Sequence, residues 1–316
     1  MVDYLDEIIG QETPKKFIRT ALKKDNLYNL LLIGPRGVGK RTLGFALAKQ
    51  LGCPIHSSYF TLVAPIPSRI KEKEDKIGEY TKKYFPENPV VELEDRTAIL
   101  IEQVRSIIQR LMHMPAKGSR RVVMILEADR MTDEAANAFL KTLEEPPVDT
   151  LFVLTSSRPH NLLPTIRSRC RIVPFSYLGT DRVSEILYEA DDELLLGSPG
   201  EMLRLQQQDL IAEALKVFNG CPMTAKTAAA TAKAYERRII VDLFYPLVLL
   251  YRLALYRKIM GTSIHSSVKS SIDKKIRTVP PAQLLDAIQR LHHSIILLEH
   301  NPNRLLLLLD VLTRLP

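Results

Sequence analysis

Short apolar runs alternate with amphipathic stretches over residues 1–175. Three of the runs have the length and continuity of buried strands, namely Asn29–Ile33, Arg121–Leu126 and Thr150–Thr155. Between them, apolar residues recur every three or four positions, which predicts helices at Thr42–Leu51, Ala98–Met112 and Thr132–Leu143. Strands that alternate with helices are typical of a parallel sheet covered by helices on its faces. The pattern therefore predicts an α/β core domain over residues 1–175.

One segment inside this domain lacks such a pattern. Pro54–Pro89 carries scattered prolines and a mixed-charge run, RIKEKEDKIGEYTKK, without a sustained apolar period. We expect residues 54–89 to form an insertion on the surface, with room for a short helix.

After Pro174 the pattern is almost purely helical. A small helical unit is expected over residues 176–208, with helices at Asp181–Glu189 and Pro199–Gln206. The turn Gly197–Gly200 (GSPG) opens the second of these helices. Longer helices follow, at Arg237–Lys258, Pro281–Leu298 and Asn303–Leu315. They predict a separate all-helical domain over residues 209–316.

Composition narrows the class of protein only slightly. The net charge of +8 permits contact with nucleic acid, although a lysine-rich solvated surface explains it equally well. No apolar run reaches the length of a membrane span. The acidic start MVDYLDEIIGQE does not have the form of a signal peptide. We therefore expect a cytoplasmic protein. Cys53, Cys170 and Cys221 form no CxxC pair, which argues against a disulfide framework and a zinc site.

The most specific chemical signal is a phosphate loop, Gly34–Lys40 (GPRGVGK), between a predicted strand and a predicted helix. Gly34, Gly37 and Gly39 allow backbone N–H groups to converge on phosphates, and the helix N-terminus adds a favourable dipole. Lys40 is expected to reach the β- and γ-phosphates.

The positions that handle the metal depart from this pattern. A Ser or Thr hydroxyl that binds Mg²⁺ should follow Lys40, but Arg41 stands there. Thr42 does not replace it, since one helical residue turns the side chain by about 100°. The later strand ends in Leu126 and Glu127, where an active ATPase has Asp and Glu. Glu127 therefore belongs either to a metal site or to an acidic turn after a core strand, and metal-dependent hydrolysis is doubtful.

Several motifs in order resemble the bacterial DNA polymerase III clamp-loader subunits of the AAA+ superfamily. They are Ile9–Glu12 (IGQE), the phosphate loop, Glu127–Pro147 (EADRMTDEAANAFLKTLEEPP) and Leu162–Cys170 (LLPTIRSRC). The combination of LKTLEEPP with RSRC is the most specific of them. The resemblance covers most of the chain apart from residues 54–89, and it implies an AAA+ P-loop domain, a small helical lid and a C-terminal helical collar.

Within that family, gamma/tau subunits hydrolyse ATP, whereas delta-prime subunits commonly have a decayed ATP site. Active members have Thr at position 41, Asp at position 126 and a sensor Arg at position 201. This chain has Arg41, Leu126 and Glu201 there, with Arg204 one turn away as a partial substitute. Thr155–Ser157 occupies the place of another sensor. The resemblance thus implies a delta-prime-type subunit without ATPase activity, in which the residues of a degenerate ATP site bind ATP or ADP weakly or not at all: Gly34, Gly37, Gly39, Lys40, Arg41 and Glu127.

The resemblance also assigns a role to Ser168-Arg169-Cys170. In the family, the Arg of this motif is an arginine finger that enters the neighbouring subunit's ATP site, so Arg169, with Ser168, is the expected catalytic contribution. On the residues alone, a basic surface loop is the better explanation of Arg167, Arg169 and Arg171, and the family match reverses this preference.

The resemblance also implies partner subunits, and it reveals one feature in which this chain departs from the family. Gamma/tau and delta are the expected partners in a heteropentameric ring, and the sliding clamp and primer–template DNA are indirect partners. Family members usually carry a four-cysteine zinc module, but this chain retains only Cys53 there, so we expect no zinc and no required cofactor. Two alternatives stay open: a divergent gamma/tau-type ATPase that uses Lys40 and Glu127, and an AAA+ protein of another process such as recombination.

Overall fold

The computed structural model describes residues 3–24, 29–67, 74–88, 91, 97–112, 119–187, 197–207, 209–235, 240–261, 268–298 and 302–316. The chain divides into two compact units. The first comprises Met1–Leu187 with Gly197–Glu201, and the second comprises Tyr188–Leu196 with Met202–Pro316.

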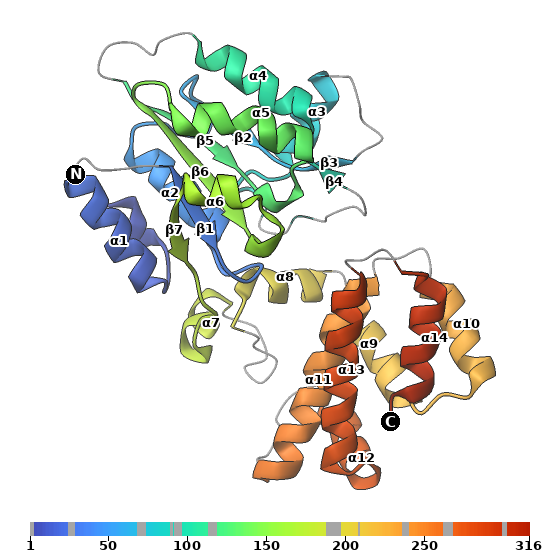
Figure 1. Ribbon diagram of the computed structural model, residues 1–316. Helices are drawn as coiled ribbons and strands as arrows, with labels where there is room; N and C mark the ends of the chain where they lie inside the picture. Colours follow the sequence, from blue (N-terminus) through green and yellow to red (C-terminus); the bar gives the residue numbers. More distant parts are fainter. Residues whose placement is uncertain are drawn as a thin grey trace. The chain divides into compact units, whose positions relative to one another are not determined.

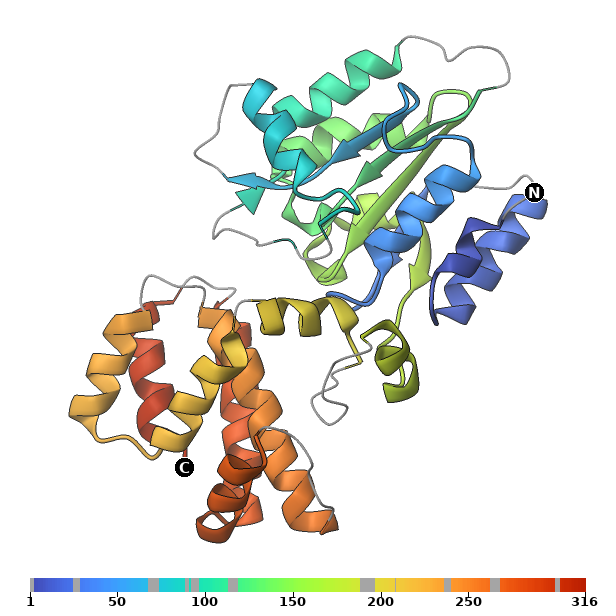
Figure 2. The ribbon, with the colours of Figure 1, turned by 180° about the vertical axis from the view of Figure 1, so that it is seen from behind.

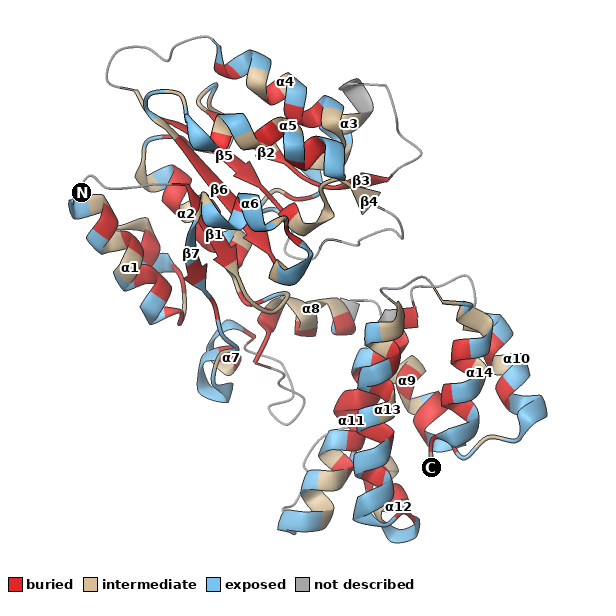
Figure 3. Ribbon diagram, viewed as in Figure 1, coloured by how far each residue is buried: buried red, intermediate tan, exposed pale blue. Residues whose placement is uncertain are grey.

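A five-stranded parallel sheet forms the centre of the first unit (Figure 1). Its order is β2-β5-β6-β1-β7, with the bounds β1 Leu30–Ile33, β2 Phe60–Val63, β5 Arg121–Ile125, β6 Thr150–Ser156 and β7 Arg171–Pro174. The central strands are buried on both faces, which explains their continuous apolar sequences (Figure 3). The α/β class and the three predicted strands are confirmed.

Helices cover both faces of this sheet (Figure 2). Successive residues of β1 point to opposite faces, so Leu30 and Leu32 enter one apolar core and Leu31 enters the other. The first core receives side chains from α1 and α2, and the second from α4, α5 and α6. The helices of this unit are η1 Tyr4–Glu7, α1 Glu12–Lys23, α2 Lys40–Gln50, α3 Glu74–Lys82, α4 Ile101–Leu111, η2 Ala128–Arg130, α5 Asp133–Glu144, η3 Pro159–Asn161, α6 Pro164–Ser168 and α7 Thr180–Ile186.

The prediction of a surface insertion at residues 54–89 is wrong in part. Phe60–Val63 forms β2, the edge strand that pairs with β5, and Phe60, Val63 and Ile66 are buried. The prediction failed because an edge strand is short and tolerates nearby prolines, so no long apolar period marks it. Ile66–Pro67 (β3) pairs with Thr97–Ala98 (β4), and the expected short helix is α3. Residues 68–73 and 89–90 lie outside the described part of the chain.

The second unit is helical, as predicted. It contains the body of α8 (Pro199–Gln207), followed by α9 Leu210–Gly220, α10 Ala225–Tyr235, α11 Ile240–Met260, α12 Lys269–Thr278, α13 Pro281–Leu298 and α14 Arg304–Arg314. Its core includes Phe218 and Tyr251, whose rings meet edge to face at 4.8 Å. The predicted three-domain boundaries stay a prediction, although α7 and Gly197–Glu201 belong to the first unit. Among the described helices, none combines the length and apolar character that a membrane crossing requires.

Candidate nucleotide site and arginine finger

The phosphate loop lies where the sequence predicts it, between β1 and α2. Gly34, Gly37 and Gly39 all have positive φ, at 146°, 70° and 96°, a region that favours glycine. Gly39 caps the N-terminus of α2. The three glycines therefore give the loop the backbone shape of a phosphate-binding turn.

Lys40, however, binds the loop itself. Its ammonium donates to the carbonyl oxygen of Gly34 at 2.6 Å, to that of Pro35, and to Ser157 Oγ at 3.1 Å. These three contacts match the three donors of a lysine. The residue is 7% exposed, and burial lowers the pKa of Lys40 to about 8, against the opposing effect of the Glu127 and Asp129 carboxylates. A phosphate must displace these contacts to bind Lys40.

The GSPG turn packs directly on the phosphate loop. The Gly200 N–H donates to Gly37 O at 2.9 Å, and Ser198 Oγ donates to Arg36 O at 2.6 Å. A Cβ at Gly200 would lie 2.8 Å from Gly37 Cα, so this approach of two backbones requires glycine. The start of α8 thus holds the loop from the side of Gly37.

The Arg41 side chain contacts the segment after α3. Its Nη2 donates to the carbonyl oxygen of Asn88 at 2.8 Å, beyond the end of α3. Burial lowers the pKa of the Arg41 guanidinium, yet an arginine stays charged in proteins, so a cation lies where a Mg²⁺ ligand is expected. Thr42 is exposed on α2.

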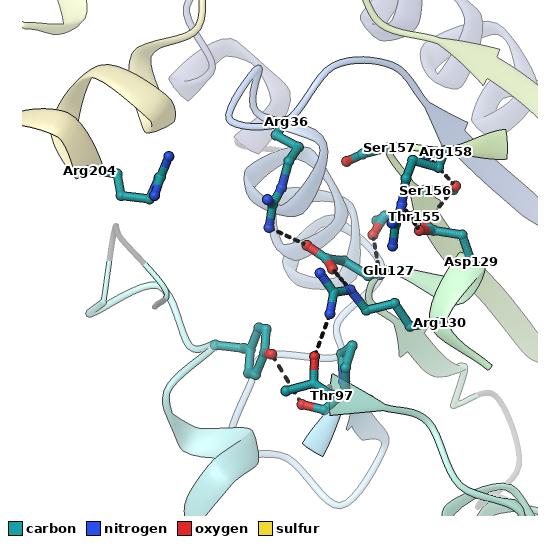
Figure 4. A network of polar contacts seen from close by, with 12 residues as sticks. Arg36, Thr97, Glu127, Asp129, Arg130, Thr155, Ser156, Ser157, Arg158 and Arg204 are labelled. Atoms are coloured by element: carbon teal, nitrogen blue, oxygen red, sulfur yellow. Dashed lines mark hydrogen bonds and ion pairs between the residues drawn. The ribbon is translucent and has the colours of Figure 1, made fainter. Parts of the chain in front are cut away.

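At the end of β5, two arginines hold Glu127 (Figure 4). Glu127 Oε2 lies 2.7 Å from Arg130 Nε, and Oε1 lies 3.5 Å from Arg36 Nη2. Its backbone N–H donates to Thr155 Oγ1 at 3.0 Å, and Arg130 also donates to Thr97 Oγ1 at 2.6 Å. The sequence prediction missed both arginines. Guanidinium groups here neutralise a carboxylate that, in an active ATPase of this pattern, positions the attacking water.

Ser156 and Ser157, at the second sensor position, form hydrogen bonds with other side chains of this chain. Asp129, whose side chain is 2% exposed, accepts from Ser156 Oγ at 2.7 Å and from Arg158 Nε at 3.1 Å. Ser157 accepts from Lys40 as described above. The Asp129 carboxylate is thus neutralised by Arg158, in the arrangement expected for a buried acid.

Leu126 adds no polar group to the site. Leu126 is 3% exposed and belongs to the apolar core, so no carboxylate stands at the predicted metal position. Arg204 forms an ion pair with Asp242 of α11, and both residues belong to the second unit. The role of Arg204 as a partial substitute for the sensor arginine stays a prediction.

Arg169 lies at the other end of the sheet from the phosphate loop. It follows α6 and precedes β7, whose first residue, Arg171, donates its N–H to Asn29 O at 2.6 Å at the start of β1. The loop begins at Gly34, after the far end of β1. Four strand residues span roughly 13 Å. The structure therefore separates Arg169 from the phosphate loop of its own chain.

The cysteines form no metal centre. Cys53 is buried, and its thiol contacts the carbonyl oxygen of Arg120 at 3.1 Å. Within the described residues, no three His, Cys, Asp or Glu side chains are grouped to bind a metal ion. The expectation that the chain needs no zinc stays a prediction.

The fold and the loop first define the class of protein, which is an α/β P-loop domain followed by a helical C-terminal region. The family described as "DNA polymerase III, delta subunit" matches residues 10–179, more than half of the chain. The chain therefore belongs to this family, as a member of the delta-prime type.

Similar proteins agree with this assignment. The chain is 32% identical over 212 residues to DNA polymerase III subunit delta' of Pseudomonas aeruginosa, which covers 67% of this chain and 58% of that protein. It is 40% identical over 119 residues to subunit delta' of Escherichia coli, covering 34% and 36%. It is also 30% identical over 165 residues to subunit tau of Salmonella typhimurium, covering 52% and 24%. These alignments thus leave much of each relative unmatched.

A solved structure resembles the chain over most of its length. It is the DNA polymerase III gamma subunit-related protein of Thermotoga maritima, which is 21% identical, with a TM-score of 0.44 and coverage of 95% of this chain and 97% of that one.

Proposed function

We propose that this chain is the delta-prime-like stator of a DNA polymerase III clamp loader, and that it supplies Arg169 to the ATP site of a neighbouring subunit. The position of Arg169 carries the proposal. Arg169 and the phosphate loop lie at opposite ends of β1, and this separation supports a role in which the guanidinium acts on a phosphate held by another chain. Such a guanidinium stabilises the charge of the phosphoryl group during its transfer.

The site in cis supports a role without hydrolysis. Lys40 binds the loop's own carbonyl groups, Arg41 replaces the hydroxyl that binds metal, Leu126 replaces a carboxylate, and Glu127 is neutralised by two arginines. Each position works against Mg²⁺-dependent chemistry. We propose that the chain binds ATP or ADP weakly or not at all, hydrolyses neither, and needs no cofactor.

The expected partners follow from the relatives. Subunits named gamma, tau and delta' are among them, so we propose assembly with gamma/tau and delta through the helical C-terminal region. The sliding clamp and primer–template DNA are reached through the assembled ring in the cytoplasm. ATP bound by a neighbour would then shift the ring's conformation, because it adds contacts to Arg169 that exist in one state only.

Reconstitution with gamma/tau, delta, clamp and primed DNA tests the proposal. Arg169→Ala is expected to lower clamp- and DNA-stimulated ATP hydrolysis about tenfold or more while the complex still assembles in size-exclusion chromatography. Arg167→Ala, which removes an exposed arginine from the adjoining helix α6, is the matched control and should have little effect. ATPase activity that is unchanged by Arg169→Ala would refute the finger role. Mg²⁺-dependent turnover by the purified chain alone would instead indicate a divergent gamma/tau-type ATPase.

A further inference from the structure

Arg169 is surrounded by groups of its own chain that fix the direction of its guanidinium. We infer that Glu144, the last residue of α5, is a positioning residue that orients Arg169 toward a phosphate of the neighbouring subunit. This inference rests on the proposed function of Arg169. Glu144 itself touches no reacting atom and acts only through the arginine.

The contacts engage all three nitrogens of the guanidinium. Glu144 Oε1 accepts from Arg169 Nε at 2.8 Å and also from Nη2. Nη1 donates to Thr165 O at 2.9 Å and, more weakly, to Ser168 Oγ at 3.4 Å. A guanidinium has five N–H donors in a rigid plane. Within the described part of the chain, these contacts leave one N–H of Nη2 for an outside acceptor, and the long Ser168 contact is readily exchanged for a phosphate oxygen.

The backbones of both partners are tied together at one buried residue. Asn29 Nδ2 donates to Leu143 O at 2.9 Å, directly before Glu144, and to Arg169 O at 3.4 Å. The carbonyl oxygen of Asn29 accepts from the N–H of Arg171. A single side chain at the start of β1 thus sets the spacing between the end of α5 and the arginine loop. These hydrogen bonds fix the backbone on both sides of the ion pair between Glu144 and Arg169.

Stability alone does not account for Glu144. The side chains of Arg169 and Glu144 are 31% and 47% exposed, and ion pairs with this exposure contribute little to folding. A negative charge at the C-terminus of a helix is also unfavourable, because the helix dipole is negative there. The carboxylate does, however, restrict a long side chain that would otherwise sample many rotamers. Restricting the arginine before it meets a phosphate favours catalysis.

The test replaces Glu144 in the reconstituted complex with gamma/tau, delta, clamp and primed DNA. Glu144→Gln keeps the shape and removes the charge. We expect kcat for ATP to fall about three- to fivefold with little change in KM. Glu145→Gln, at the adjacent exposed carboxylate, is the matched control and should behave as wild type. In an Arg169→Ala background, Glu144→Gln should have no further effect, since Glu144 acts only through Arg169.

Three results would overturn the inference. The first two are a kcat equal to that of wild type and a higher kcat, which would mean that Glu144 holds the arginine back. An additional loss in the Arg169→Ala background would also overturn it, because it would show a structural effect independent of the arginine. Glu144→Asp, which keeps the charge on a shorter arm, should give an intermediate kcat. If Arg169→Ala itself has no effect, the finger proposal fails. If only Glu144→Gln has no effect, the positioning role fails alone.

Discussion

Replacing Lys40 by Met should stabilise this protein near neutral pH. In an active P-loop the lysine binds nucleotide phosphates, but here its ammonium is buried against the carbonyl groups of Gly34 and Pro35. Burying a charge without a carboxylate in direct contact is costly. Met has a similar length and carries no charge, so the substitution removes this cost and retains most of the packing.

The size of the effect follows from the pKa of Lys40, which burial lowers from 10.5 to about 8. That change corresponds to about 3 kcal/mol between the charged and neutral forms. The variant loses the hydrogen bonds of the amine, which offsets part of the gain, so we expect a net stabilisation of about 1–2 kcal/mol at pH 7. Below pH 8 both folded and unfolded chains keep the proton. Between pH 8 and 10.5 the unfolded chain binds more protons, so wild-type stability rises with pH in that window.

Urea denaturation of both proteins near pH 7 and near pH 10 measures this difference. The stability advantage of Lys40→Met should be largest near pH 7 and should shrink near pH 10. Lys16→Met, at an exposed lysine of α1, is the control and should show no such dependence on pH. A Lys40→Met protein less stable than wild type at pH 7, or a difference that does not change with pH, would refute the reasoning.

Three further predictions concern the loop and its surroundings. Arg41→Thr restores the missing hydroxyl but should produce no Mg²⁺-dependent ATPase in a phosphate-release assay, because Leu126 stands where the metal-binding carboxylate is expected. Glu127→Gln should leave the ATPase of the reconstituted complex within about twofold of wild type, whereas loss of a base that positions water would cost orders of magnitude; a large fall would mean that Glu127 is catalytic. Gly200→Ala should lower stability by about 1–3 kcal/mol in urea denaturation, because its Cβ meets the backbone of Gly37 at 2.8 Å. Gly78→Ala, with open space around the added Cβ, is its control and should be neutral or slightly stabilising.

The sheet was predictable to the extent that its strands are buried on both faces. Parallel strands such as β5 and β6 are continuous apolar runs, and such runs stand out in a sequence. The edge strands β2 and β7 were not predicted as strands. Each has four residues and one unpaired side, and β7 is largely exposed, so neither has a long apolar signature.

The properties of the site could be predicted from the sequence only where the identity of a single residue determines whether a ligand is present. Arg41 and Leu126 reveal the loss of metal ligands because each stands at a fixed offset in a local motif. The pairing of Glu127 with Arg36 could not be predicted in the same way, since the two residues are distant in sequence and meet only after the sheet forms. The same holds for Glu144, which reaches its arginine through the packing of α5 beside α6.

The proposed division between an inactive site in cis and an active arginine in trans can be tested in one comparison. Clamp- and DNA-stimulated ATPase activity would be measured for the reconstituted complex containing wild type, Lys40→Met or Arg169→Ala. The account predicts that Lys40→Met stays within about twofold of wild type, while Arg169→Ala falls about tenfold or more. A complex that loses its activity with Lys40→Met and keeps it with Arg169→Ala would contradict the account.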